Sequence, residues 1–507
     1  MPPAANRFLV TGARVLAQDA DVDMPPVADV LVEDGLIRKI GDLHAVEDVT
    51  RVDLAGHLLA PGFVNAHYHS HDVLAKGSFE RLTLERWALV SGAIGAGRSE
   101  AEVRLRTLLG AVECLKNGIT TVQDFATLNP LTPLIDVVAN AYASAGVRVI
   151  LSPTVRDLSQ ADSILWINEL ASDEEARVVG RTAPDGPTQL AVIGEAMDRI
   201  GDRGGLIRWA VSPSAPQRCS FEFLQAIDRF RRERRLPVYT HLYETRLQRL
   251  FADQELARFG GSAVTMMQEA GLLDGGVSFA HCIWIRPEEV RQLADAGAGV
   301  ILNMLSNLKL RSGIAPIRAL REAGIPLSLG CDNCSCSDVQ SMLQVMKLYC
   351  LLSGVAGETG GPEAAEAIGL ATTAGARTAG LQGRIGTLAP GMAADMVAYD
   401  LSDIAWQPLN SVARQLVFAE TGRAIRHVWV AGQPRVWAGR CAPEIEAEIA
   451  DQLARLMPGV RTDLAALSAR AATMSDVFSR IDQRLDCHFD LSRLPFDATY
   501  QQRERSQ

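Results

Sequence analysis

The middle of the chain alternates short apolar runs with segments long enough for a helix. Residues 105–115, for example, carry leucine and valine at helical spacing immediately before a β-branched run. Eight apolar or β-branched runs are typical of buried strands: residues 58–64, 119–122, 147–151, 207–211, 237–240, 277–280, 299–302 and 325–329. Eight strands alternating with helices predict an α/β fold, a (β/α)₈ barrel of the TIM type.

The two ends of the chain follow a different pattern. Short strands and turns are predicted near the N-terminus at residues 8–10, 27–32 and 36–40, and again after the barrel at residues 383–388, 395–399 and 428–433. Apolar residues then recur at helical spacing from Ile445 to Leu456. We therefore expect a small β-sandwich built from residues 1–60 and 383–440, a barrel of residues 61–382 and a C-terminal helical extension of residues 441–507.

Composition narrows the classes of protein that remain. The chain has 507 residues, of which 48% are hydrophobic and 22% charged, as in soluble globular proteins. The net charge is -10 without a wide basic cluster, so no nucleic-acid partner is expected. No uncharged run approaches the roughly 18 residues of a membrane span. Nine cysteines without a leader-like start lead us to expect a cytoplasmic protein with reduced thiols.

Three of the nine histidines stand at alternate positions just after the first apolar run, at His67, His69 and His71. Alternate strand residues project to the same side, so His67 and His69 face together. At the C-terminal end of a barrel strand that side is the mouth of the barrel, and two imidazoles there form half of a metal site. The strand should be ending at His71, which we expect to face substrate or to support the ligands.

Other strand ends carry residues suited to the same site. His241 closes the fifth predicted strand and Glu244 follows three residues later, while His281 closes the sixth and Asp332 follows the eighth. Since all these ends meet at one rim of a barrel, the pattern predicts a metal centre at its mouth.

The chain resembles the amidohydrolase superfamily, in the branch of cytosine, guanine, adenosine-thioether and triazine deaminases and chlorohydrolases. The resemblance runs in order from about residue 8 to about residue 440. It is carried by APGFVNAHYH, NGITTVQD, VSPSAP, HLYET, FAHC, SNLKLRSGIAP, LGCDN, GTLAPGMAADMVAYD and VAGQPRV.

The resemblance implies a ligand set for one divalent metal, with His281 beside it: His67, His69, His241 and Asp332. Binuclear relatives carry a bridging lysine at the end of the fourth strand, where residues 210–214 have none, which implies a single ion. Histidines with a carboxylate suit Zn²⁺ or Fe²⁺, and the sequence does not choose between them. Non-haem iron oxygenases are a weaker alternative, because they use only two histidines with the carboxylate.

The residues also suggest a mechanism. A bound divalent metal lowers the pKa of water from about 16 to around 7, and Asp332 is placed to accept the proton of that water. His281 would orient the nucleophile or polarise the group under attack. Glu244 would be the proton shuttle that protonates a ring nitrogen and then the leaving group.

These roles predict a hydrolase acting on a C–N bond, most simply one that deaminates an aminated purine, pyrimidine, pterin or triazine. Cleavage of an amide, urea, alkylamine or halide substituent is the alternative, and a non-catalytic scaffold is a third reading that the complete residue set disfavours. The partners expected are a small-molecule substrate and water, with a homo-oligomer formed through the C-terminal helices. Trp87, Trp284 and His71 are the candidate substrate contacts.

Three cysteines surround the predicted ligand Asp332, at Cys331, Cys334 and Cys336. A separate structural zinc site is one reading, but no second cysteine pair at matching spacing accompanies them. We expect them instead to line the floor of the pocket as small apolar groups.

Overall fold

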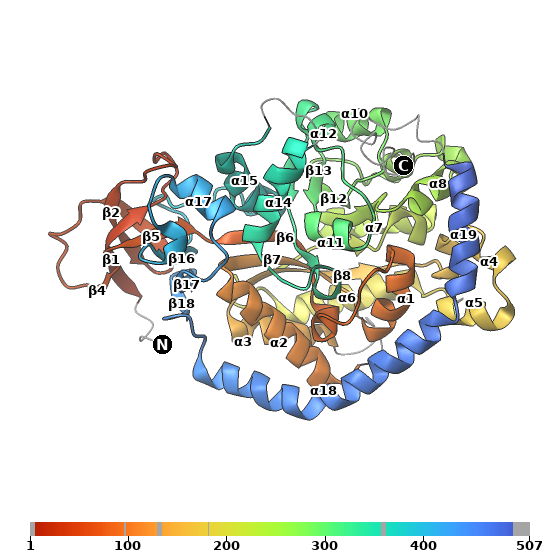
Figure 1. Ribbon diagram of the computed structural model, residues 1–507, viewed down its shortest axis with the longest axis horizontal. Coiled ribbons are helices and arrows are strands. Elements are labelled where there is room, and N and C mark those ends of the chain that lie inside the picture. The colour runs from red at the N-terminus through yellow and green to blue at the C-terminus, as the bar shows by residue number, and fades with distance from the viewer. Residues whose placement is uncertain (1–5, 96–97, 129–133, 181, 356–360, 490–507) are drawn as a thin grey trace.

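The computed structural model describes residues 6–95, 98–128, 134–180, 182–355 and 361–489. A barrel of strands and helices occupies the centre, with a smaller β layer at one end (Figure 1). Helix α18 runs along one edge of the barrel and α19 turns up its far side (Figure 1). The site described below lies in the barrel.

Eight parallel strand positions form the barrel. They are β6 (Phe63–His69), β7 (Ile119–Ala126), β8 (Arg148–Val155), β9 with β10 (Ile207–Trp209, Ser212–Pro213), β11 (Val238–Leu242), β12 (Val277–His281), β13 (Gly299–Leu302) and β14 with β15 (Leu327–Leu329, Asp332–Asn333). A parallel bridge from Val211 to Val238 joins the fourth position to the fifth. The eighth position pairs with β13 through β14 and with β6 through β15, which closes the ring. The predicted (β/α)₈ fold class is confirmed.

Helices cover the outside of the barrel and its mouth. The longer ones are α1 (Leu84–Gly95), α2 (Glu100–Lys116), α3 (Leu134–Ala145), α6 (Gly186–Ile200), α7 (Phe221–Arg234), α8 (Arg246–Glu255), α10 (Pro287–Ala296) and α14 (Met342–Val355). Their starts follow the expected chemistry: the side chain of Ser99 caps α2 and that of Ser220 caps α7 by accepting a backbone N–H.

The apolar run at residues 58–64 is not one strand, and the sequence prediction is wrong there. Its first part is β5 (His57–Pro61), which belongs to the smaller sheet, and the barrel strand begins only at Phe63. Gly62 separates them because the chain passes close to β7 at this point: a Cβ on Gly62 would lie 2.3 Å from Thr120 Oγ1. A continuous apolar run does not show which of two sheets each residue joins.

The smaller sheet takes strands from both ends of the chain. It contains β1 (Arg7–Val15), β2 (Val27–Glu33), β3 (Leu36–Gly41), β4 (Thr50–Asp53), β5, β16 (Met396–Asp400), β17 (Ile425–Val430) and β18 (Gln433–Val436). Strand β16 pairs antiparallel with β5, which joins the C-terminal strands to the N-terminal ones. Of the strands and turns predicted at residues 383–388, the structure has turns and bends at 383–387, with Gly383 and Gly386 at positive φ, and a single parallel bridge from Leu388 to Ala17.

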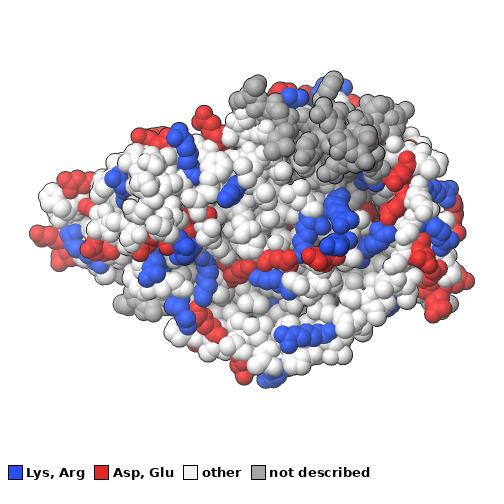
Figure 2. Space-filling view, viewed as in Figure 1, with Lys and Arg blue, Asp and Glu red and all other residues white. Residues whose placement is uncertain are grey.

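The C-terminal helices α18 (Pro443–Ala472) and α19 (Ser475–His488) pack against their own chain. An apolar face of α19 that includes Phe478 and Ile481 is buried in one cluster with Leu247 of α8. Ion pairs add to this packing, among them Arg86–Asp482 and Arg246–Asp486, each at 2.8 Å. Basic and acidic side chains lie next to each other along this edge of the molecule (Figure 2). Among the described residues, no helix combines the length and apolar character needed to cross a membrane.

A buried ion pair joins the barrel to the smaller sheet. Both Arg148 of β8 and Asp395, just before β16, are less than 10% exposed, and the guanidinium contacts both carboxylate oxygens. Asp395 also accepts the backbone N–H of Ala431 at 2.7 Å. Removing one partner of such a pair leaves the other charge buried without compensation.

We expect Asp395→Ala to lower the free energy of unfolding by about 3–5 kcal/mol, because Arg148 would remain buried and unpaired. Denaturant unfolding followed by circular dichroism measures the change. Asp136→Ala, which removes an exposed pair with Arg199, is the control and should leave the midpoint nearly unchanged. Equal effects of the two substitutions would contradict this role of Asp395.

Candidate metal centre

The H-x-H segment ends the first barrel strand. Every residue of β6 is buried, and His67 and His69 lie on the same side of it, with ring centroids 4.8 Å apart. The Nδ1 atom of His69 lies 2.8 Å from the carbonyl oxygen of Phe125, which leaves its Nε2 directed into the site. His71 lies beyond the strand, in the 3₁₀ turn Ser70–Ala75.

The strand ends bring four histidines and one aspartate together. The Nε2 atoms of His69 and His241 are 3.3 Å apart, and Asp332 Oδ1 lies 3.2 Å from His67 Nε2 and 3.5 Å from His69 Nε2. The Nε2 atom of His281 is 3.9 Å from Asp332 Oδ2. Two groups with metal-binding spacing result, and both include His67: one with His69 and His241, the other with His281 and Asp332.

The unsatisfied atoms of the cluster fit a metal ion. Both ring nitrogens of His67 and the Nε2 atom of His281 are buried without a hydrogen-bond partner among the described residues. Buried polar atoms are nearly always paired, so three unpaired nitrogens in one cluster indicate a missing partner. Imidazole nitrogens with one carboxylate oxygen form a donor set that Zn²⁺ prefers.

The electrostatics favour the protonation states that ligands require. Burial is the main cause that lowers the pKa of His69 to about 3 and the pKa of His241 well below its usual value, so these imidazoles are neutral at pH 7. Burial alone would raise the pKa of Asp332, but the neighbouring histidines outweigh it and hold that pKa well below the usual range. Neutral imidazoles and an ionised carboxylate are the metal-binding forms.

The backbone around the eighth strand is tightly constrained. Asp332 has a φ of 63° and His281 a φ of 74°, a left-handed conformation that non-glycine residues rarely adopt. The side-chain oxygen of Asn65 accepts the backbone N–H of Cys331 at 2.9 Å. At Gly330, a Cβ would lie 2.4 Å from Asn303 Oδ1 and 2.6 Å from His67 Cβ. The close approach of the first and eighth strands therefore requires a residue without a side chain.

Asp72, three residues after His69, supports the loop that follows Asp332. Its carboxylate accepts the backbone N–H of Cys334 at 3.1 Å and that of Ser335 at 2.9 Å. The hydroxyl of Ser335 in turn accepts the indole N–H of Trp87 at 2.8 Å. Sequence reasoning missed this role, although Asp72 directly follows the alternating histidines.

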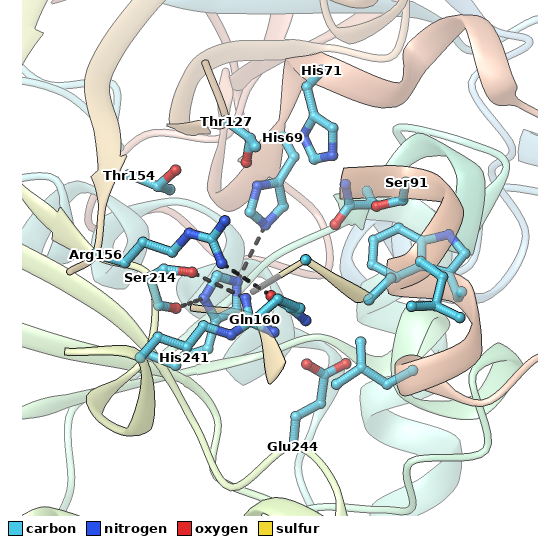
Figure 3. Close-up of a pocket in the computed structure, with 18 of the residues that line it drawn as sticks. His69, His71, Ser91, Thr127, Thr154, Arg156, Gln160, Ser214, His241 and Glu244 are labelled. Carbon is cyan, nitrogen blue, oxygen red and sulfur yellow. Dashed lines mark hydrogen bonds between the residues drawn. The ribbon is translucent and has the colours of Figure 1, made fainter. Parts of the chain in front are cut away.

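A cavity of about 550 Å³ opens onto the cluster. His69, His241 and Glu244 face the same space, with His71 above them (Figure 3). Trp87 also lines the cavity. Trp284 is not among the described residues that line the cavity. Its indole N–H donates to the carbonyl oxygen of Ser312. The structure therefore gives no support to Trp284 as a substrate contact.

Glu244 has one carboxylate oxygen directed at His281. Its Oε2 lies 3.6 Å from His281 Nε2, while its Oε1 is buried without a partner among the described residues. Burial is the main cause that raises the pKa of Glu244 to about 7. On its other side, His281 Nδ1 lies 2.8 Å from the side-chain oxygen of Asn307, an acceptor that places the proton of the neutral ring on Nδ1. The sequence pattern alone does not single out Asn307 for this role.

The three cysteines near Asp332 are buried, and burial raises the pKa of each thiol. Cys331 Sγ lies 3.6 Å from Met342 Sδ, and Cys334 Sγ lies 3.4 Å from Gln340 Nε2. None of them belongs to a metal-binding group within the part of the chain that the structure describes. They pack behind the cavity wall instead of lining its floor as we expected.

This fold and site place the chain in a known family. The Amidohydrolase family profile matches residues 58–435, about three quarters of the sequence, and the chain belongs to that family. The predicted class, a hydrolytic enzyme, is thereby confirmed.

Relatives and solved structures agree with the assignment. A 5-methylthioadenosine/S-adenosylhomocysteine deaminase of Pyrococcus furiosus is 28% identical over 85% of this chain and 96% of its own. A 5'-deoxyadenosine deaminase of Methanopyrus kandleri is 29% identical over 77% of this chain and 84% of its own. An adenosine deaminase structure from Xanthomonas campestris with bound zinc has a TM-score of 0.75 at 25% identity, covering 90% of this chain and 99% of that one.

A further structure supports the fold alone. It is an atrazine chlorohydrolase from Arthrobacter aurescens in complex with zinc, with a TM-score of 0.77 at 22% identity, covering 89% of this chain and all of that one. Both solved neighbours hold zinc.

We expect Gly330→Ala to lower metal affinity about 10- to 100-fold, because its Cβ would displace His67 or the strand that carries Asp332. Metal content after dialysis against graded chelator measures the effect. Gly459→Ala in α18, where a Cβ meets no atom within 4 Å, is the matched control. Unchanged metal retention in Gly330→Ala would contradict the role assigned to this close approach.

Proposed function

We propose that the protein is a mononuclear metal-dependent aminohydrolase that releases ammonia from an aminated nitrogen heterocycle. The observation that carries this proposal is the position of Glu244, with its carboxylate in the cavity and 3.6 Å from His281 beside the histidine–aspartate cluster. The names of the relatives support it, since they are deaminases of adenosine derivatives.

Four residues would hold the ion, with His281 next to them: His67, His69, His241 and Asp332. Zn²⁺ or Fe²⁺ suits this donor set. When bound, such an ion makes water a nucleophile near neutral pH and polarises the group under attack. A single ion is supported by residues 210–214, which offer no lysine to bridge a second one, and by His67, which belongs to both candidate ligand groups.

Asp332 and His281 would manage the attacking water. The carboxylate of Asp332 is ionised, and it accepts the proton that the water loses. Since the Nδ1–H of His281 donates to Asn307, its Nε2 presents a lone pair to the cavity and orients the water by accepting a hydrogen bond. The water is thus held between two acceptors and directed at the substrate carbon.

Glu244 would move the protons of the substrate. With a pKa of about 7, a substantial fraction of Glu244 is protonated at neutral pH and can donate to a ring nitrogen. That protonation makes the adjacent carbon more electrophilic. Glu244, now ionised, accepts the remaining proton of the hydroxyl group added to that carbon and passes it to the amino group, so that the C–N bond breaks and ammonia leaves. Trp87 offers an aromatic face to the planar ring in the cavity.

We expect Glu244→Gln to reduce kcat by about 10²- to 10⁴-fold while metal content stays near that of the wild type, because the amide cannot shuttle a proton. Ammonia release from aminated purines, pyrimidines, pterins and triazines, paired with elemental analysis, measures both quantities. Glu222→Gln, at an exposed position in α7, is the control. Activity that survives Glu244→Gln would remove Glu244 from the mechanism.

Dialysis against a chelator should abolish turnover, and one equivalent of Zn²⁺ or Fe²⁺ per chain should restore it, because four residues converge on one position. Titration of the metal-free protein with each ion gives the stoichiometry. A requirement for two ions per chain would contradict the mononuclear site. Release of alkylamine or chloride in place of ammonia would favour the same hydrolase with a different leaving group.

A further inference from the structure

Two arginines line the cavity without a carboxylate partner. Arg156 directly follows β8, and Arg218 ends the short turn Pro216–Arg218 after β10. Neither forms an ion pair with any carboxylate of the described residues. A partly buried guanidinium without a counter-charge is costly unless something else supplies that charge.

Arg156 is held in place by neutral groups. Its backbone N–H donates to the side-chain oxygen of Gln189 at 3.4 Å, and its carbonyl accepts from the Gln189 amide at 2.8 Å. Its guanidinium donates to Gln160 Oε1 at 3.2 Å. Figure 3 shows the side chain of Arg156 extending into the space that His69 and His241 also face. The charge is therefore positioned but not neutralised.

Arg218 is connected to the metal cluster through Ser214. Its Nη1 donates to the hydroxyl of Ser214 at 3.1 Å, and the carbonyl oxygen of the same serine lies 2.6 Å from His241 Nδ1. Its Nε is buried without a partner among the described residues. Burial, followed by the nearby charge of Arg156, lowers the pKa of Arg218 to about 10, while the more distant charges of Glu244 and Glu85 act in the opposite direction, so the group remains charged at neutral pH.

Several other buried arginines of the protein form ion pairs with carboxylates. Arg148 faces Asp395, Arg249 faces Glu289 and Asp253, and Arg231 faces Asp228 and Asp274. Arg106 also lacks a close ion pair, but it does not line the cavity. Arg156 and Arg218 thus line the cavity without a carboxylate of the described residues in ion-pair contact.

The carboxylates that line the cavity contact groups other than Arg156 and Arg218. Asp332 contacts the histidines, and Asp185 accepts hydrogen bonds from the backbone and hydroxyl of Thr188. Glu244 is needed for proton transfer under the proposed function and does not lie within ion-pair distance of either arginine. An anionic ligand in the cavity would supply the direct contact that these two guanidinium groups lack.

We propose that Arg156 and Arg218 form a subsite for a negatively charged substituent, a carboxylate or a phosphate, on the heterocyclic substrate. The inference rests on the proposed function and adds the substrate class. A guanidinium binds both anions through paired N–H groups, and a cavity of about 550 Å³ has room for more than a bare ring. The ring would lie near Glu244 and Trp87, with its charged substituent at the arginines.

Matched substrate pairs test this subsite and separate the two anions. The phosphate arm compares adenosine 5'-phosphate with adenosine. The carboxylate arm compares S-adenosylhomocysteine with 5'-methylthioadenosine, and pterin-6-carboxylate with pterin. In at least one pair the anionic member should have a kcat/KM at least tenfold higher. Arg156→Gln and Arg218→Gln should each reduce that ratio about 10- to 100-fold, as expected for a lost charged hydrogen bond.

Two further variants control for folding and for charge. Arg199→Gln removes an exposed arginine on α6 and should leave the ratio unchanged. Arg156→Lys keeps the charge without the paired donors and should retain part of the preference. If the anionic and neutral members of every pair react equally, or if the glutamine variants slow both members alike, the subsite is wrong.

A binding measurement separates this inference from the proposed function. Calorimetry on metal-loaded Glu244→Gln protein, with the same pairs, reports anion preference without turnover. Tighter binding of an anionic member that is lost in the Arg156→Gln background supports the subsite even if the wild type releases no ammonia, in which case only the deaminase proposal fails. Ammonia release without any anion preference in binding would overturn the subsite and leave the deaminase proposal standing.

Discussion

The attraction between the Asp332 carboxylate and the imidazoles around it is the interaction on which the site depends. The carboxylate lies at the meeting point of the first and eighth strands, within 4 Å of His67, His69 and His281. Burial would otherwise favour a neutral acid, and the histidines reverse that preference. The barrel makes this possible because parallel strands that close into a ring must all end at one rim.

The residues around the cluster constrain the positions of the side chains that would bind the metal. Three imidazoles and a carboxylate can share one metal position only if their directions are fixed before an ion binds. Asn65, Asp72 and Gly330 supply that rigidity through side-chain hydrogen bonds to the eighth-strand loop and through close strand contact. The left-handed backbone at Asp332 is maintained by the same contacts.

The cavity above the cluster has an uneven distribution of charge. Glu244 lies beside His281, whereas Arg156 and Arg218 lie on the side of the third and fourth strands. The helices α18 and α19 lie beyond the matched family region and add to the surroundings of the cavity: Arg470 of α18 lines it, and α19 packs on α8. Loops and extensions of this kind give one barrel chemistry different substrate preferences.

Local patterns in the sequence determined the barrel strands and most of the residues of the metal centre. Strand alternation predicted that His67 and His69 face together, the order of apolar runs predicted eight strands, and the strand ends supplied His241, His281 and Asp332. These features follow from the alternation of side chains along a strand and from the order of apolar and polar segments along the chain. Only the tertiary structure decided that the run at residues 58–64 divides between two sheets, that Trp284 does not line the cavity, and that Arg218 lines it without a carboxylate of the described residues in ion-pair contact. Those outcomes depend on contacts between residues far apart in the chain, which no local pattern contains.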